Sequence, residues 1–209
     1  MADQRQHVTI TDRSNAISAR HPVLAVISLL LLCCSTLDAT AQDDYERCQT
    51  QYGVSGVIEI DELTTIASSG DIEAQYCLGV VLHDGKGVER NPTKAIEWYE
   101  KAGEKGHYAS QYWLCLMYKD GIGAKVSSLE ARYWCQRAGN SGNPEGMYAM
   151  GLWYLSSVIR DRDVRAYIWF LRAANAGELE ARTMLELLSS QLTELQIREA
   201  IKLEEQGEQ

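Results

Sequence analysis

The sequence is poor in phenylalanine, proline and basic residues. Its 209 residues contain one Phe and three Pro, and Lys and Arg together number 20 against 29 Asp and Glu. Aromatic packing therefore depends on Tyr and Trp, which bury a large apolar body and keep a polar group for a partner or for solvent. The net charge of -9, with no cluster of Lys and Arg, argues against nucleic acid as a ligand. It indicates an acidic, solvated surface.

The chain also lacks the cysteine spacing of common metal and redox sites. It holds six Cys but no C-x-x-C pair, which is the usual signature of a zinc knuckle or a thioredoxin-like motif. No glycine-rich loop follows a predicted strand, because no segment reads convincingly as a strand. The sequence therefore predicts neither a metal site nor a bound cofactor.

The first forty residues differ in character from the rest. An uncharged apolar run at 23–34 follows Arg13 and Arg20 and precedes the small residues at 39–41. This order predicts a secretory signal peptide at 1–41, cleaved before Gln42. The run is too short for a bilayer core, which needs about 20 residues. An uncleaved anchor is the alternative, because the segment before the run is long for a signal. A lipoprotein is not expected, because leucine precedes the cysteines of the run where lipid attachment requires a small residue.

An internal repeat dominates the remaining chain. The segment that begins at Asp84 returns thirty-six residues later at Asp120. Six small or aromatic residues of the first copy recur at this spacing: Gly85, Ala95, Trp98, Ala102, Gly103 and Gly106 become Gly121, Ala131, Trp134, Ala138, Gly139 and Gly142. A third copy, one residue shorter, holds Ala166, Trp169, Ala173 and Gly177. The chain thus contains three full units and a partial unit at each end.

Each unit reads as two helices. Ala95, Trp98, Tyr99 and Ala102 follow the i, i+3, i+4, i+7 spacing of one helical stripe, so Trp98 and its counterparts Trp134 and Trp169 are expected in the core. The segment AQYCLGVVL, which starts at Ala74, supports the other helix. The helix ends are signalled by cap residues and glycines: Asn91-Pro92, Asn143-Pro144, Ser127 with Glu130, Thr193 with Gln196, and Gly106, Gly142 and Gly177.

One such hairpin cannot bury its apolar stripe alone, so successive hairpins must stack. The predicted fold is all-α, a right-handed α/α solenoid of stacked helical hairpins. After the signal peptide at 1–41, the expected segments are an N-terminal partial repeat at 42–70, repeat one at 71–106, repeat two at 107–142, repeat three at 143–177, and a C-terminal partial repeat with a closing helix at 178–209.

The strings AQYCLG from Ala74, DGKGV from Asp84 and KAIEWYEKA from Lys94 resemble the Sel-1-like repeat, a relative of the tetratricopeptide repeat. The resemblance covers roughly 61–177, and the stretch from Leu192 resembles the family's closing helix. The third unit departs from the pattern, with Ser156-Ser157-Val158 in place of glycines. The second unit has Cys115 where the pattern expects glycine.

Four cysteines follow the predicted signal: Cys48, Cys77, Cys115 and Cys135. An even number in an exported chain favours disulfides, although the spacing leaves three connectivities open. The resemblance places Cys115 and Cys135 on the two helices of unit two, which implies a Cys115–Cys135 bond and leaves Cys48 for Cys77. Buried free thiols are the alternative.

The resemblance also implies where a partner would bind. In related repeats the first helix of each hairpin lines the concave face, and nine side chains are expected to be exposed there: Tyr76, Val80, His83, Tyr112, Leu116, Lys119, Tyr148, Leu152 and Leu155. The three tyrosines form a row at the repeat spacing and suit a protein or peptide ligand. A purely structural row of tyrosines is the alternative.

No nucleophile, base and acid converge in the sequence. Only His83 and His107 follow the signal, and His83 is expected to be solvated, because adjacency along a helix does not aim it at Asp84. The chain is therefore predicted to be a non-catalytic exported scaffold for a protein or peptide partner, in envelope assembly, signalling or host interaction. A bacterial periplasm is the expected location, and secretion is the alternative. The membrane is expected to matter only through export or an uncleaved anchor. Other readings are a hydrolase of cell-wall or β-lactam-like substrates, and a structural subunit of an envelope machine.

Overall fold

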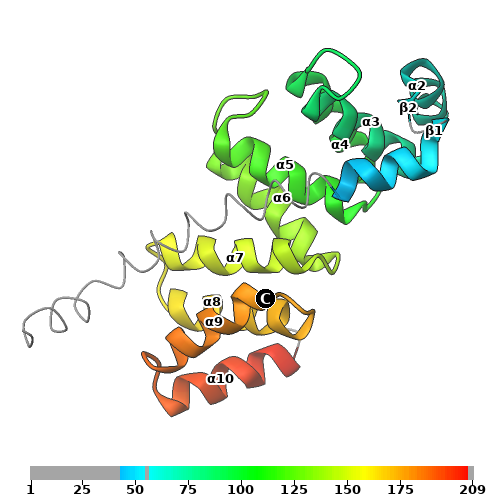
Figure 1. Ribbon diagram of the computed structural model, residues 1–209. Coiled ribbons are helices and arrows are strands. Elements are labelled where there is room, and N and C mark those ends of the chain that lie inside the picture. The colour runs from blue at the N-terminus through cyan, green and yellow to red at the C-terminus, as the bar shows by residue number, and fades with distance from the viewer. Residues whose placement is uncertain (1–42, 55–56, 207–209) are drawn as a thin grey trace, which may run out of the picture. The chain divides into compact units, whose positions relative to one another are not determined.

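A computed structural model describes residues 43–54 and 57–206 of the chain (Figure 1). The predicted signal peptide lies outside these residues. Residues 43–52 are helical, and two short antiparallel strands follow, β1 (Gly53–Val54) and β2 (Val57–Ile58), which the sequence did not predict. The remaining elements are helices: α2 (Ile60–Ser68), α3 (Ile72–Asp84), α4 (Pro92–Glu104), α5 (Tyr108–Asp120), α6 (Ser128–Asn140), α7 (Pro144–Ser156), α8 (Arg162–Asn175), α9 (Leu179–Ser189) and α10 (Glu194–Glu205).

The helices pair as antiparallel hairpins, α3 with α4, α5 with α6, and α7 with α8. Each hairpin packs on the next, through α4 with α5 and through α6 with α7, and Figure 1 shows this succession from α2 to α10. The last helix, α10, packs against α8. The predicted all-α solenoid of stacked hairpins is confirmed.

The second helix of every hairpin ends in the same way. After α4, the amide of Gly106 donates to the carbonyl of Gly103 and the amide of His107 donates to Ala102. This pair of bonds is the Schellman motif, and it needs a left-handed residue at the position of Gly106, whose φ is 94°. Gly142 and Gly177 close α6 and α8 with the same bonds, as the repeat predicted.

The predicted helix starts are also present. Side chains of Asn91, Ser127, Asn143 and Thr193 each accept a hydrogen bond from a backbone amide of the first turn. Thr193 and Gln196 form a reciprocal capping box. These caps satisfy amides that a helix cannot bond internally, so they fix where each helix begins.

The two helices of each hairpin meet at one equivalent position, through a glycine and an aromatic ring in two units and through a disulfide in the other. In the first unit, a Cβ added to Gly79 would lie 2.5 Å from the ring of Tyr99, and in the third unit Gly151 meets Phe170 at the same distance. Both rings are buried. In the second unit, the matching residues are Cys115 and Cys135, which form a disulfide. The disulfide therefore occupies the place of a contact between glycine and an aromatic ring.

The tryptophan prediction is right for two units and wrong for one. Trp134 and Trp169 are buried, and each indole packs on a glycine of the preceding second helix, Gly103 and Gly139. Trp98 is only half-buried and carries the Lys101 ammonium over its ring. The residue that matches Gly103 one unit earlier is Ala67, so the chain offers Trp98 no glycine at this position.

The loop before α8 is made without glycine. Ser157 ends α7 in an extended conformation, and Asp161 adopts φ of 60° immediately before α8. Among the described residues, Asp161 is the one non-glycine residue with positive φ. In the first two units a left-handed glycine directly follows the first helix, whereas in unit three the left-handed residue stands at the end of the loop.

Candidate functional site

The face formed by α3, α5 and α7 is less open than the sequence analysis expected. Tyr76, Val80 and Leu116 are buried, so their prediction as exposed contact residues is wrong. The ring of Tyr76 lies 4.5 Å from that of His107, and the Arg47 guanidinium stands 5.0 Å from its centre. Side chains from two other helices cover this tyrosine, which the spacing within α3 could not reveal.

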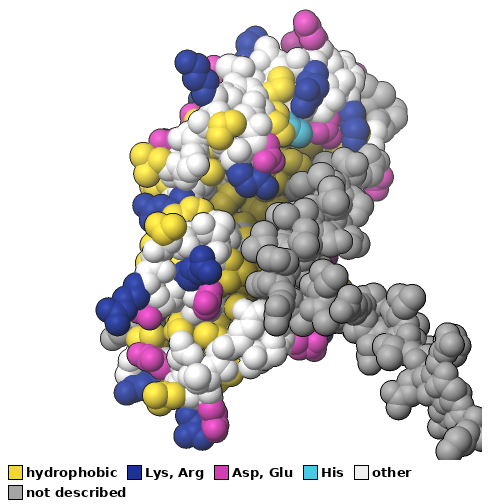
Figure 2. All heavy atoms as spheres, turned by 90° about the vertical axis from the view of Figure 1, so that its left-hand side faces the viewer, with side chains coloured by type: hydrophobic (Ala, Val, Ile, Leu, Met, Phe, Trp, Pro, Cys, Tyr) yellow, Lys and Arg dark blue, Asp and Glu magenta, His cyan; other side chains and the backbone are white. Residues whose placement is uncertain are grey.

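The other six predicted contact residues reach the surface to different degrees. Lys119 is exposed, whereas five are half-buried: His83, Tyr112, Tyr148, Leu152 and Leu155. Tyr148 rests on Phe170, with ring centres 5.4 Å apart. Figure 2 shows one face of the molecule, on which hydrophobic side chains gather in a band bordered by charged ones. The tyrosine row thus begins at α5 rather than at α3.

His83 is not a solvated histidine. Its Nδ1 lies 2.9 Å from Oδ1 of Asp84, and its ring centre lies 5.1 Å from that of Trp113 on α5. The neighbouring carboxylate does meet the ring, because both residues lie in the last turn of α3, where side chains can bend toward the loop. The expectation of a solvated loop-edge histidine is therefore wrong.

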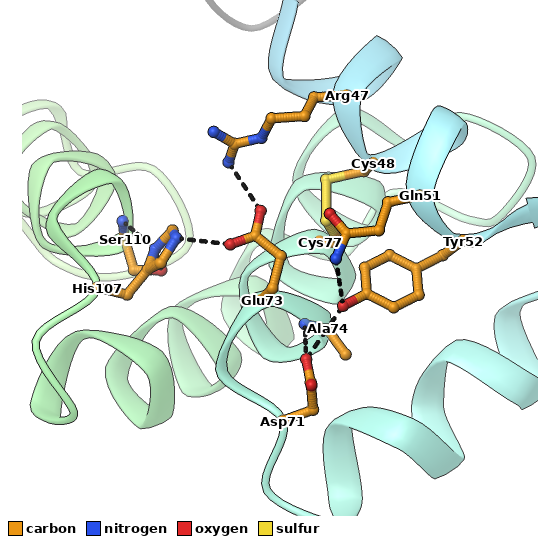
Figure 3. Close-up of a disulfide and its surroundings, with 10 residues drawn as sticks. All are labelled: Arg47, Cys48, Gln51, Tyr52, Asp71, Glu73, Ala74, Cys77, His107 and Ser110. Atoms are coloured by element: carbon orange, nitrogen blue, oxygen red, sulfur yellow. Dashed lines mark hydrogen bonds and ion pairs between the residues drawn. A yellow bond between two sulfur atoms is a disulfide. The ribbon is translucent and has the colours of Figure 1, made fainter.

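A chain of polar side chains joins three helices beside the first disulfide (Figure 3). Glu73 on α3 accepts from Nε2 of His107 at 3.2 Å and pairs with Arg47 at 3.1 Å. Nδ1 of His107 accepts from the amide of Ser110 at 3.2 Å, so His107 is the N-cap of α5 and its proton lies on Nε2. The hydrogen bond from His107, aided by Arg47, lowers the pKa of the Glu73 carboxyl below its ordinary value.

This chain contains the residue types of a catalytic triad, which the sequence analysis did not find. The hydroxyl of Ser110 lies 2.9 Å from Nδ1 of His107, and Glu73 orients the other ring nitrogen. However, Ser110 is fully buried, and Nδ1 already accepts the amide hydrogen bond that caps α5. A nucleophile must reach its substrate and needs a base with a free lone pair. The geometry therefore describes a helix cap that links adjacent units.

A cleft of about 310 Å³ opens between α8 and α10. Ile168 and Trp169 of α8 and Leu203 of α10 give it an apolar lining, and Arg165 and Gln196 add polar groups. None of these five residues was singled out as a binding residue from the sequence. The sequence carries little indication of this cleft, because the closing helix has no counterpart in the repeats with which it could be aligned.

The two disulfides join Cys48 to Cys77 and Cys115 to Cys135, with Cα atoms 5.4 Å and 4.9 Å apart. These are the pairs that the resemblance implied. Such bonds persist in oxidising compartments, so they are consistent with an extracytoplasmic protein.

In the described ranges, no group of three His, Cys, Asp or Glu side chains is placed to hold a metal ion. The helices in the same ranges also lack the combination of length and apolar character that a bilayer crossing requires.

Comparison with known proteins identifies the repeat. The family model of the Sel1 repeat matches the chain three times, at residues 72–107, 109–143 and 144–178. A Sel1 repeat protein from Oxalobacter formigenes has a similar crystal structure, with a TM-score of 0.56, 33% identity, and coverage of 61% of this chain and 97% of that one.

A second crystal structure is that of a protective antigen from uropathogenic Escherichia coli, which displays an SLR fold. It has a TM-score of 0.63 and 28% identity over 78% of this chain. The match covers 36% of the antigen, so this chain corresponds to about a third of it. No functionally curated protein matches the chain.

Proposed function

The chain belongs to the Sel1 repeat family, whose members generally mediate protein–protein interaction, and from this premise we propose that it is a non-catalytic scaffold that binds a protein or peptide through α5 and α7. Envelope assembly, signalling or host interaction is the proposed context. We place the protein in the periplasm, with secretion as the alternative, because its disulfides suit an oxidising compartment.

The observation that carries the proposal is the pair Tyr112 and Tyr148. They stand at the same repeat position on adjacent hairpins, and both remain half-exposed although Tyr76 before them is buried. Leu152 and Leu155 continue the partly exposed surface along α7. Tyrosine buries a large area at low cost in rotamer entropy, so two of them beside leucines suit a peptide or protein surface.

A photo-crosslinking amino acid tests this surface. Benzoylphenylalanine replaces Tyr112 or Tyr148 in the full chain, and the control position is Glu97, which is exposed on the polar side of α4. The expected result is one crosslinked protein common to positions 112 and 148, absent at 97 and lost when Leu152→Asp is added. Crosslinks of equal yield at all three positions would contradict the proposal.

Hydrolysis is the second candidate function, because hydrogen bonds link Ser110 to His107 and His107 to Glu73. Purified protein is assayed with a chromogenic β-lactam, alongside Ser110→Ala. Turnover that disappears in this variant while the fold is retained would favour an enzyme. Our proposal expects no turnover in either protein, because the hydroxyl is buried.

A further inference from the structure

The outer face of α8 packs against α10, and the cleft described above lies between the two helices. Val164 and Ile168 on this face are each 7% exposed. At its end, Arg172 lies over the ring of Trp169, 5.1 Å from the ring centre, and forms an ion pair with Glu204 of α10. Two apolar side chains are thus almost buried on the face of α8 that packs against the last helix, which also supplies a carboxylate to the arginine beside them.

The same face of α6 is open. Thirty-five residues earlier in the chain, Leu129 takes the place of Val164 and Tyr133 takes the place of Ile168. Leu129 is 68% exposed and Tyr133 is 48% exposed, and Val126 just before α6 is exposed as well. An apolar surface that is covered on one hairpin is thus bare on the hairpin before it.

The arginine of this face is also repeated, but without its carboxylate. Arg137 matches Arg172 and lies over the ring of Trp134, 5.4 Å from the ring centre. It donates to the hydroxyl of Tyr133 and to the carbonyl of Glu104. Within the described part of the chain, no ion pair joins Arg137 to a carboxylate.

The open apolar face is not a general property of the repeat. On α4 the matching residues are Thr93 and Glu97, both exposed, with Lys101 in the place of Arg137. These side chains are polar and need no cover. Of the three second helices, α4 thus has a polar open face, α8 an apolar covered face, and α6 an apolar open face.

We propose that the α6 face, formed by Val126, Leu129, Tyr133 and Arg137, binds an amphipathic helix of a partner protein in the manner in which α10 covers α8. The chemistry of that helix follows from α10. Its Glu204 pairs with Arg172 of α8, its Leu203 lines the cleft that it shares with α8, and Ala200 on the same helical stripe is buried. The partner helix therefore presents a small residue, an apolar residue and a carboxylate at i, i+3 and i+4, the spacing of one helical stripe.

Charge and burial both support this occupant. A carboxylate from the partner would give Arg137 the ion pair that Glu204 gives to Arg172. Removing the exposed area of Leu129 and Tyr133 from water supplies the hydrophobic gain. The α6 face is distinct from the proposed contact residues on α5 and α7, so an experiment can contradict one of the two proposed binding surfaces and leave the other standing.

The probe is a fluorescent, hydrocarbon-stapled peptide with the sequence of residues 193–206, because an isolated helix of this length is marginal in water. Its affinity for the full chain is measured by fluorescence anisotropy. We expect at least a tenfold loss for Leu129→Ser and for Arg137→Glu. A peptide with Glu204→Arg should bind Arg137→Glu better than the original peptide does, since the charges are then exchanged as in a double-mutant cycle.

Three controls separate the possible causes. Lys101→Glu makes the same charge change at the matching position of α4 and should leave the affinity unchanged. Leu129→Ser changes an exposed side chain, so its melting temperature should equal that of the unchanged protein. Tyr148→Ala, in the surface proposed above, should also leave peptide binding unchanged.

Several outcomes overturn the proposal. The first is no binding at millimolar peptide, and the second is equal binding by Leu129→Ser, Arg137→Glu and the unchanged chain. The third comes from a photo-reactive version of the peptide: crosslinks should map to α6, and crosslinks to α8 would show that the peptide displaces α10 instead. The fourth is a dimer that dissociates on Leu129→Ser, because a second copy of the chain would then be the occupant.

Discussion

The Cys115–Cys135 disulfide can be exchanged for the contact that its neighbouring units use. Its two residues occupy the positions of Gly79 with Tyr99 and of Gly151 with Phe170. The double variant Cys115→Gly with Cys135→Phe rebuilds the form found in the third unit. The variant Cys115→Ser with Cys135→Ser removes the bond and puts nothing in its place.

The disulfide and the contact between glycine and phenylalanine should stabilise the fold by similar amounts. The bond closes a loop between residues 20 apart, for which chain entropy gives about 3 kcal/mol of stabilisation. A buried phenylalanine is worth about 3 to 5 kcal/mol relative to alanine, and glycine within a helix costs about 1 kcal/mol. The serine pair should therefore lose about 3 kcal/mol, whereas the Gly/Phe pair should lie within about 1 kcal/mol of the unchanged protein.

Urea unfolding followed by circular dichroism, without reductant so that Cys48–Cys77 stays closed, measures both variants. The two variants, which both lack the bond, should share one unfolding slope, steeper than that of the unchanged protein, whose cross-linked unfolded state exposes less surface. The free energies extrapolated to water therefore carry the comparison. A Gly/Phe variant no more stable than the serine pair would refute the equivalence of the two contacts.

Three further perturbations test burial and charge. Trp134→Ala should cost about 3 to 5 kcal/mol in thermal unfolding, because its buried indole packs on a neighbouring helix; an unchanged melting temperature would contradict its burial. Gly151→Ala should cost about 1 to 3 kcal/mol, since its methyl group would overlap the ring of Phe170; calorimetry showing no loss would mean that the ring moves freely. Burial and a hydrogen bond with Glu180 raise the pKa of Glu178 to about 8, so its stabilising contribution is complete below its ordinary pKa of 4.5 and is lost as pH rises through about 8. Glu178→Gln stays neutral, so its melting temperature should fall less than that of the unchanged protein between about pH 4.5 and about pH 8; parallel falls would refute this.

Much of the fold could be predicted because its signals are local. Asn91, Asn143 and Thr193 begin helices through side chains that reach the amide three residues further along the chain. Gly106 and its counterparts end helices because a left-handed residue is needed there. The small and aromatic residues recur at intervals of 36 and then 35 residues, and this regularity predicts stacked hairpins.

The candidate site was less predictable, because exposure depends on other elements. The repeat treats Tyr76 and Tyr112 alike, yet Tyr76 is buried beside Arg47 and His107, whereas Tyr112 is half-exposed. Glu73 and His107 lie 34 residues apart in the chain and meet only after adjacent hairpins stack. The pairing of His83 with Asp84 depends on a side-chain bend at a helix end that periodicity does not encode.

Neighbouring residues therefore specify the helices, their caps and the repeat that identifies the family, because short-range hydrogen bonds and a regular apolar stripe depend only on residues close in the chain. Which of the repeated side chains stay exposed depends instead on how the hairpins pack. Leu129 and Val164 hold the same place in their units, but Val164 is 7% exposed on a helix that packs against α10, whereas Leu129 is 68% exposed. Burial is a property of the packed neighbours, and an equal repeat position does not give two side chains equal surroundings.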